Sequence, residues 1–136
     1  MNVLVDTDVL IDLALDRSPH SKPAGLLLDL LQKRRAEGFL AWHSASNFYY
    51  LVAPKRGKAD SRAFLLDLAQ FMEIAPTTTD SLRQAGRLEL RDFEDAMQVA
   101  AAIACGAEVI ATRNLRDYGG SPIKPVRPME LIKALS

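Results

Sequence analysis

Short apolar segments alternate with longer helix-like segments along the whole chain, and this alternation restricts the possible folds more than any other feature. Strands separated by helical crossovers form βαβ units, in which the strands pair in parallel between two layers of helices. We therefore predict an α/β fold with three layers (α/β/α) and a central, mostly parallel sheet of four to five strands. The expected strands are residues 2–6, 39–42, 72–75, 108–112 and, at the edge, 125–126.

Helical periodicity predicts about seven helices between and after these strands. The expected ranges are 8–15, 19–38, 44–52, 60–71, 77–90, 92–105 and 128–135, with a turn at 54–58 and a loop at 115–122. Seven helices for five strands imply that several crossovers carry two helices. We find no repeats and no long linker, and a length of 136 residues suits one domain spanning residues 1–136.

Composition restricts the functional classes. The 17 basic and 17 acidic residues balance, so nucleic-acid binding has to rely on local basic patches. The single cysteine, Cys105, excludes an intrachain disulfide framework and suits a reducing cytoplasm. Acidic residues interrupt the N-terminal apolar stretch, which argues against a signal peptide, and no apolar run approaches membrane-spanning length. We therefore expect a cytoplasmic protein without membrane contacts.

Three aspartates lie where a parallel sheet gathers its functional side chains. Asp6 follows the apolar run Val3-Leu4-Val5, Asp95 lies in the first turn of an expected helix, and Asp117 follows the expected strand 108–112. The carboxyl ends of central strands line the crevice of such folds. Carboxylates meeting there repel one another unless a cation lies among them. We therefore interpret Asp6, Asp95 and Asp117 as ligands of a hard divalent metal ion with catalytic roles.

Other acidic residues near these positions have simpler interpretations. Asp8 is expected to cap a helix or to support the site from behind, and Asp12 to be hydrogen-bonded or solvated. Asp92 shares a helix face with Asp95, so it is either a supporting site residue or the N-cap. Glu94 is expected on the surface. His43 has no partner at zinc-ligand spacing and is interpreted as structural.

Residues 112–116, at the end of the expected strand 108–112 and just after it, include four more candidates. Asn114 fits either a contact to a phosphate or to a metal-bound water, or a turn. Arg113 and Arg116 are placed to neutralise phosphate charge beside the acidic residues. Thr112 ends the strand. No histidine is expected nearby for metal-free acid–base cleavage, so hydrolysis of a phosphodiester with metal-activated water is the favoured chemistry.

The chain resembles the PIN domain family, and most of all the VapC-type ribonuclease toxins of toxin–antitoxin pairs. The resemblance rests on residues 3–12, 92–98 and 112–118 in this order and spacing. It implies a PIN-like fold with Asp6, Asp95 and Asp117 as metal ligands, supported by Thr112 and Asn114. It further implies Mg²⁺ or Mn²⁺, cleavage of single-stranded RNA, a homodimer and an inhibitory antitoxin protein as partner.

Two positions depart from the pattern of that family. Many members carry a glutamate in the helix after the second strand, where this chain has Asn47, and many carry aspartate at the position of Asn114. The loss of formal charge should weaken the binding of a second cation. We therefore hypothesise one firmly bound metal ion in the absence of RNA, with Asn47 in a supporting role.

Two other functions remain open at this point. Asp6-Thr7-Asp8 also matches the opening of haloacid-dehalogenase phosphatases, in which the first aspartate is the nucleophile and the second an acid. A PIN-like fold that has lost catalysis and serves as an RNA-binding or interaction module is the other alternative, and Asn47 favours it.

Overall fold

All five strands of the protein run parallel in one sheet. The computed structural model describes residues 1–136. The strands are β1 (Asn2–Val5), β2 (Glu37–Leu40), β3 (Met72–Ile74), β4 (Val109–Ala111) and β5 (Lys124–Val126). Their order in the sheet is β3-β2-β1-β4-β5, with parallel pairing throughout. The predicted fold class is confirmed, and β1 lies at the centre of the sheet.

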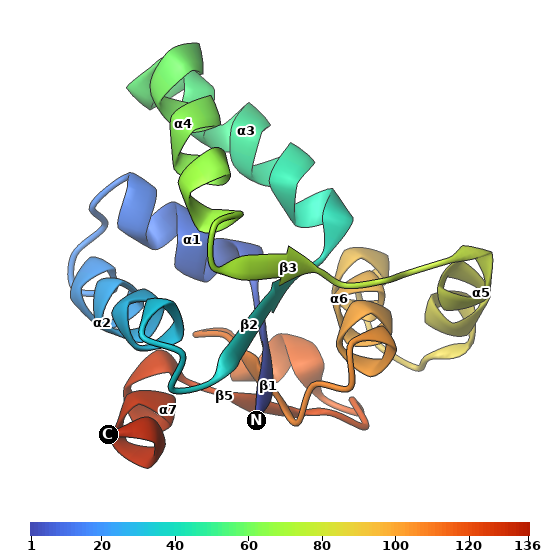
Figure 1. The fold of residues 1–136 in the computed structure, drawn as a ribbon. Coiled ribbons are helices and arrows are strands. Elements are labelled where there is room, and N and C mark those ends of the chain that lie inside the picture. The colour runs from blue at the N-terminus through green and yellow to red at the C-terminus, as the bar shows by residue number, and fades with distance from the viewer.

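Helices cover both faces of this sheet (Figure 1). They are α1 (Thr7–Ala14), α2 (Ser21–Gln32), α3 (Trp42–Arg56), α4 (Lys58–Leu68), α5 (Thr79–Arg87), α6 (Phe93–Ala104) and α7 (Pro128–Leu135), with a short 3₁₀ helix η1 (Leu115–Tyr118). In Figure 1, α1, α2 and α7 lie on one side of the sheet, α6 lies on the other, and α5 packs outside α6. Three layers result, as expected.

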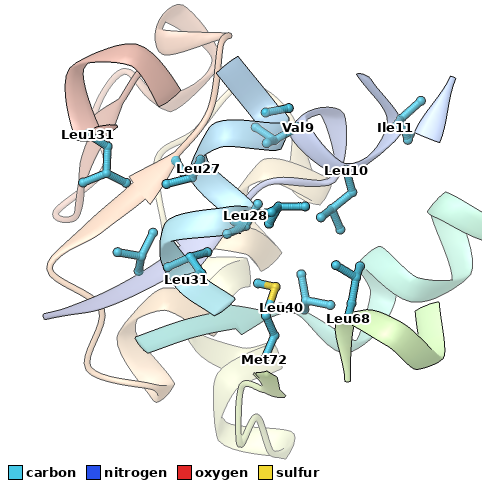
Figure 2. Close-up of a cluster of buried hydrophobic side chains, with 14 of the residues drawn as sticks. Val9, Leu10, Ile11, Leu27, Leu28, Leu31, Leu40, Leu68, Met72 and Leu131 are labelled. Carbon is cyan, nitrogen blue, oxygen red and sulfur yellow. The ribbon is translucent and has the colours of Figure 1, made fainter. Parts of the chain in front are cut away.

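The central strands bury side chains on both faces, which explains why they are apolar without alternation. Val3 and Val5 belong to the larger core beneath α1, α2 and α7, whereas Leu4 belongs to the smaller core beneath α6. Figure 2 shows the larger core, where Leu27 and Leu31 of α2 pack with residues of the neighbouring helices. The central strands are therefore packed between two cores. The paired strands β1 and β4 end at the same edge of the sheet.

The helix expected at 19–38 ends earlier, and its last residues belong to β2. Helix α2 stops at Gln32, Arg34 follows with a left-handed φ of 59°, and β2 begins at Glu37. Gly38, which we interpreted as the end of the helix, lies inside the strand. A Cβ there would come within 3.1 Å of both Leu31 and Met72, so close packing, not helix termination, explains this glycine.

The borders of α3 also differ from the prediction. Trp42 was expected in a strand, but it is the first residue of α3 and its side chain is 71% exposed. The expected turn at 54–58 is mostly helical, because α3 continues through Pro54 to Arg56. Gly57 then ends α3 with a φ of 92°, a backbone conformation that residues with a side chain rarely adopt.

None of the helices is both long enough and apolar enough to cross a lipid bilayer.

Candidate active site

An acidic cavity of about 490 Å³ opens at the carboxyl edge of the sheet, where β1 and β4 end. Its walls come from α1, α3, the start of α6 and η1. The predicted ligands Asp6, Asp95 and Asp117 all line it. The other polar residues of the lining are Thr7, Asp8, Arg17, Asn47, Lys55, Glu94 and Asn114. Segments more than a hundred residues apart in sequence therefore bring carboxylates to one place.

Asp6 is the deepest of these carboxylates, with only 7% of the residue exposed. Its backbone N–H donates to the carbonyl of Ala111, which extends the sheet by one bond. Its Oδ2 accepts hydrogen bonds from Thr112 Oγ1 and Tyr118 Oη, each at 2.9 Å. No side chain donates a hydrogen bond to Oδ1, which leaves this oxygen available to a ligand. Burial raises the pKa of Asp6, and the two hydroxyl donors oppose that rise.

Tyr118 was part of a recognised motif but had no predicted role. The structure buries it in the smaller core, with its hydroxyl on Asp6. Burial and the adjacent Asp6 raise the pKa of the Tyr118 phenol, which keeps the phenol protonated as a donor. An aromatic residue just after an acidic motif could have signalled this contact, because a buried phenol seeks a polar partner.

Asp8, expected either to cap a helix or to support the site, lies in the cavity, and the N-cap position of α1 is occupied by Asp6. The Oδ2 of Asp8 accepts from Asn114 Nδ2 at 2.7 Å, which gives Asn114 an orienting contact at the site. Its Oδ1 is buried and has no hydrogen-bond partner. Burial, and after it the charge of Asp6, raises the pKa of Asp8 to about 7. A buried carboxylate oxygen without a donor is costly unless a cation binds it.

The first turn of α6 presents three acidic residues, of which Asp92 has the structural role. Asp92 is the N-cap, and its Oδ1 accepts from the backbone N–H groups of Glu94 and Asp95 at 2.8 and 3.2 Å. Asp95 lines the cavity. Its pKa is raised to about 7 by burial and then by the charges of Glu94 and Asp6. Carboxylate oxygens of Asp92, Glu94 and Asp95 lie within 4.8 Å of one another.

Glu94 was expected on the surface, and its side chain is 40% exposed, but a role at the site was not foreseen. It lines the cavity and its Oε1 lies 3.1 Å from His43 Nε2, so His43 is not merely a packing residue. Asn47, at 3.4 Å, donates to the same oxygen. The hydrogen bond from His43 holds the pKa of Glu94 below its usual range, in contrast to the raised pKa of Asp95 beside it.

The two arginines predicted to contact phosphate lie outside the lining of this cavity. Arg113 binds Asp12 instead, through Nε at 2.7 Å and Nη2 at 3.3 Å. Arg17 completes the pairing of Asp12 at 2.8 Å. Arg116 is exposed on η1. The positive charges on the cavity wall are those of Arg17 and Lys55.

The donor set of the cavity fits a hard divalent cation. Its ligand atoms are carboxylate and amide oxygens, with no cysteine and no histidine among the lining residues. Mg²⁺ and Mn²⁺ prefer such oxygen donors. The unpartnered Oδ1 of Asp8 and the free Oδ1 of Asp6 are the atoms that a cation would satisfy.

The raised pKa values of Asp8 and Asp95 predict an unusual pH dependence of stability. A carboxyl whose folded pKa lies near 7 and whose unfolded pKa lies near 3.8 retains its proton only in the folded state between these values. Without metal, the stability of the protein should therefore fall as the pH rises from about 4 to 7 and then level off. Thermal unfolding in EDTA at several pH values measures this.

Added Mg²⁺ or Mn²⁺ should restore the stability lost at high pH, because the cation neutralises the carboxylates of Asp8 and Asp95 as protons do at low pH. The rise in melting temperature on adding metal should consequently be larger at pH 8 than at pH 5. An equal metal effect at both pH values would contradict a metal site built on these carboxylates.

Comparisons with known proteins agree with the fold. A family model described as "PIN domain" matches residues 2–116. Among solved structures, VapBC2 from Rickettsia felis, bound to a DNA fragment from its promoter, has a TM-score of 0.72 at 17% identity and covers 93% of this chain and 98% of that chain. The toxin VapC20 from Mycobacterium tuberculosis, described as cleaving the sarcin-ricin loop, has a TM-score of 0.70 at 19% identity, with 93% and 99% covered.

A third similar structure is VapBC-1 from nontypeable Haemophilus influenzae, with a TM-score of 0.70 at 13% identity and 95% and 99% covered. A search of curated proteins found no match. At these identities the likeness to solved structures establishes the fold. The match of the family model extends over most of the chain, from β1 into η1.

Proposed function

The chain belongs to the PIN domain family, and on that premise we propose that it is a metal-dependent endoribonuclease that hydrolyses phosphodiester bonds of single-stranded RNA. The observation that carries the proposal is the convergence of Asp6, Asp95 and Asp117 on one cavity. Asp8 adds a fourth aspartate to the same walls. A surface of this kind repels a phosphodiester unless a cation lies between them, so the metal is part of the proposed chemistry.

Asp6, Asp8, Asp95 and Asp117 would hold Mg²⁺ or Mn²⁺. When bound, such an ion polarises a phosphoryl oxygen and activates water for hydrolysis. The protein positions the free oxygen of Asp6 through the donors Thr112 and Tyr118, which occupy only its Oδ2. Asn114 orients Asp8 in the same way. Asp117, which is exposed on η1, is placed to bind the ion or to orient the attacking water.

Lys55 and Arg17 supply the positive charge that an RNA backbone needs at this acidic site. Both line the cavity, and Lys55 lies in the last turn of α3 at its rim. Arg116, exposed on η1, is a further candidate for phosphate contact. Arg113 is less suited to that role, because its guanidinium binds both oxygens of Asp12 and lies outside the cavity lining, whereas Arg17 contacts one oxygen of Asp12 and lines the cavity. With no net charge overall, the protein relies on these local cations for RNA binding.

We also propose that the protein acts as the toxin of a VapBC-type pair in the cytoplasm, with an antitoxin protein as partner and a homodimer as its assembly. The support is the resemblance of fold to VapC20 and to the VapBC assemblies, which are themselves described as toxins or toxin–antitoxin structures. Membership in the PIN family argues against the haloacid-dehalogenase alternative. In that alternative Asp8 would be a free acid, whereas its Oδ2 here is held by Asn114.

The test is cleavage of short end-labelled single-stranded RNAs by the full chain with Mg²⁺, with Mn²⁺ and with EDTA. We expect internal cleavage with either metal and none with EDTA. Cleavage that persists in EDTA would overturn the metal-dependent mechanism. RNA binding that is insensitive to EDTA, without cleavage at any metal concentration, would instead support the non-catalytic interaction module.

A further inference from the structure

Three side chains converge on one oxygen of Glu94. Its Oε1 lies 3.1 Å from His43 Nε2, and it accepts from Asn47 Nδ2 and Gln98 Nε2, each at 3.4 Å. The donors come from two helices, α3 and α6, so the carboxylate is held from both sides. A surface glutamate is not normally fixed in this way, because its side-chain entropy opposes it.

None of these three donors binds the other oxygen of Glu94, Oε2, and the carboxyl group of Asp95 is a further hydrogen-bond partner of the carboxylate. Glu94 lines the acidic cavity next to Asp95, and carboxylate oxygens of the two residues lie within 4.8 Å of each other. This arrangement repeats that of Asp6, where one oxygen is held by donors and the other is left free. In both residues, the side-chain donors of the neighbouring helices or strands bind one oxygen and leave the other available.

The support of Glu94 continues into the buried interior. Gln98 is fully buried, and its Nε2 also donates to Ser44 Oγ at 2.8 Å and Thr7 Oγ1 at 3.1 Å. Thr7 in turn donates to Ser44 at 2.8 Å and follows Asp6 directly in the chain. One polar network therefore positions the segment of Asp6 and the carboxylate of Glu94 relative to each other.

The helix terminus does not explain the position of Glu94. An acidic side chain in a first helical turn often serves the exposed N–H groups there. In α6, however, Asp92 already accepts from the N–H groups of Glu94 and Asp95. The Glu94 carboxylate is directed instead toward α3, where Asn47 and His43 meet it.

We propose that Glu94 is a ligand of the divalent cation, held in place by His43, Asn47 and Gln98. This inference rests on the proposed metal-dependent function and adds a residue to its site. It also assigns Asn47 a role: the uncharged amide does not bind the ion but positions the charge that does. In this arrangement Glu94 of α6 supplies a negative charge beside position 47 of α3, where this chain has the uncharged Asn47.

The experiment measures Mn²⁺ affinity by isothermal titration calorimetry on the full chain without RNA. We expect Glu94→Gln, which keeps the shape and removes the charge, to weaken binding by about tenfold or more. Glu108→Gln is the matched control. It makes the same change at an exposed residue just before β4, at the opposite edge of the sheet, and should leave affinity unchanged.

A rescue variant separates a ligand from a merely structural residue. Asn47 Nδ2 lies 3.4 Å from Glu94 Oε1, so a carboxylate at position 47 would place negative charge at the same wall. In the Glu94→Gln background, Asn47→Glu should restore most of the lost Mn²⁺ affinity. A loss caused by damaged packing would not be restored by this second substitution.

Glu94→Asp, which keeps the charge but shortens its reach, is the second variant and should weaken binding less than Glu94→Gln. Circular dichroism in EDTA verifies the fold of each variant. Unchanged Mn²⁺ affinity in folded Glu94→Gln overturns the inference even if the wild type cleaves RNA. Weakened affinity in a protein that cleaves no RNA supports the role of Glu94 while the proposed ribonuclease function fails.

Discussion

Replacing Asp6 with asparagine is expected to reduce the proposed RNA cleavage by on the order of a thousandfold and at the same time to raise the melting temperature of the metal-free protein. Both effects have one cause. The charge of Asp6 is needed by the cation, but burial makes that charge unfavourable when no cation is present. The asparagine Oδ1 still accepts from Thr112 and Tyr118, so the local structure is retained.

Cleavage assays with Mn²⁺ and thermal unfolding in EDTA test the two parts separately. Asp67→Asn, at an exposed position of α4, is the control and should change neither quantity. Adding Mn²⁺ should remove the advantage of Asp6→Asn in melting temperature, because only the wild type binds the ion tightly. Retained cleavage in Asp6→Asn would refute the assigned role, and a large loss of melting temperature in EDTA would refute the electrostatic explanation.

Arg113→Ala is expected to destabilise the protein by about 2–3 kcal/mol. Asp12 is 2% exposed, and Arg113 binds both of its oxygens. Without Arg113 the buried carboxylate retains only Arg17, and part of its desolvation is no longer offset. Arg113→Lys should recover only part of the loss, since an ammonium group does not reproduce the two-point contact. Chemical denaturation of the three proteins measures these differences.

Arg83→Ala is the matched control, because it breaks an ion pair with Asp80 in which both side chains are exposed. It should cost under about 0.5 kcal/mol. The expectation from the sequence, that Arg113 contacts phosphate, makes the opposite prediction for Arg113→Ala. It requires weaker RNA binding with unchanged stability, and that result would contradict the structural role described here.

The sheet and the meeting of its acidic side chains could be predicted because they depend on local signals. Val3-Leu4-Val5 is apolar at every position, as a strand buried on both faces must be, and Asp6 interrupts it at once. Parallel strands share one carboxyl edge, so Asp6 and Thr112 were expected at the same edge of the sheet. The direct pairing of β1 with β4 then brings them into contact. For Asp92, the position before a helix allowed a capping role or a site role, and the structure shows the capping hydrogen bonds.

What the sequence could not indicate are contacts between elements whose relative rotation is set only by packing. A helix-face argument put Glu94 away from the core, which it is, but could not show that α3 meets it there through His43 and Asn47. Arg113 was correctly placed near the acidic residues in sequence, yet its side chain reaches Asp12. From the sequence, Gly38 was expected at the end of a helix. The structure places it in β2, where Met72 packs too closely for a side chain at this position.

The walls of the acidic cavity come from α1, α3, α6 and η1, which are brought together only by folding. We therefore expect the unfolded chain to bind a divalent ion much more weakly than the folded protein. A ligand that binds only the folded form lowers the population of opened molecules. Proteases attack those opened molecules. With a metal ion in the proposed site, we therefore expect the lifetime of this protein against degradation to depend on the supply of divalent ions around it, whether or not RNA is present.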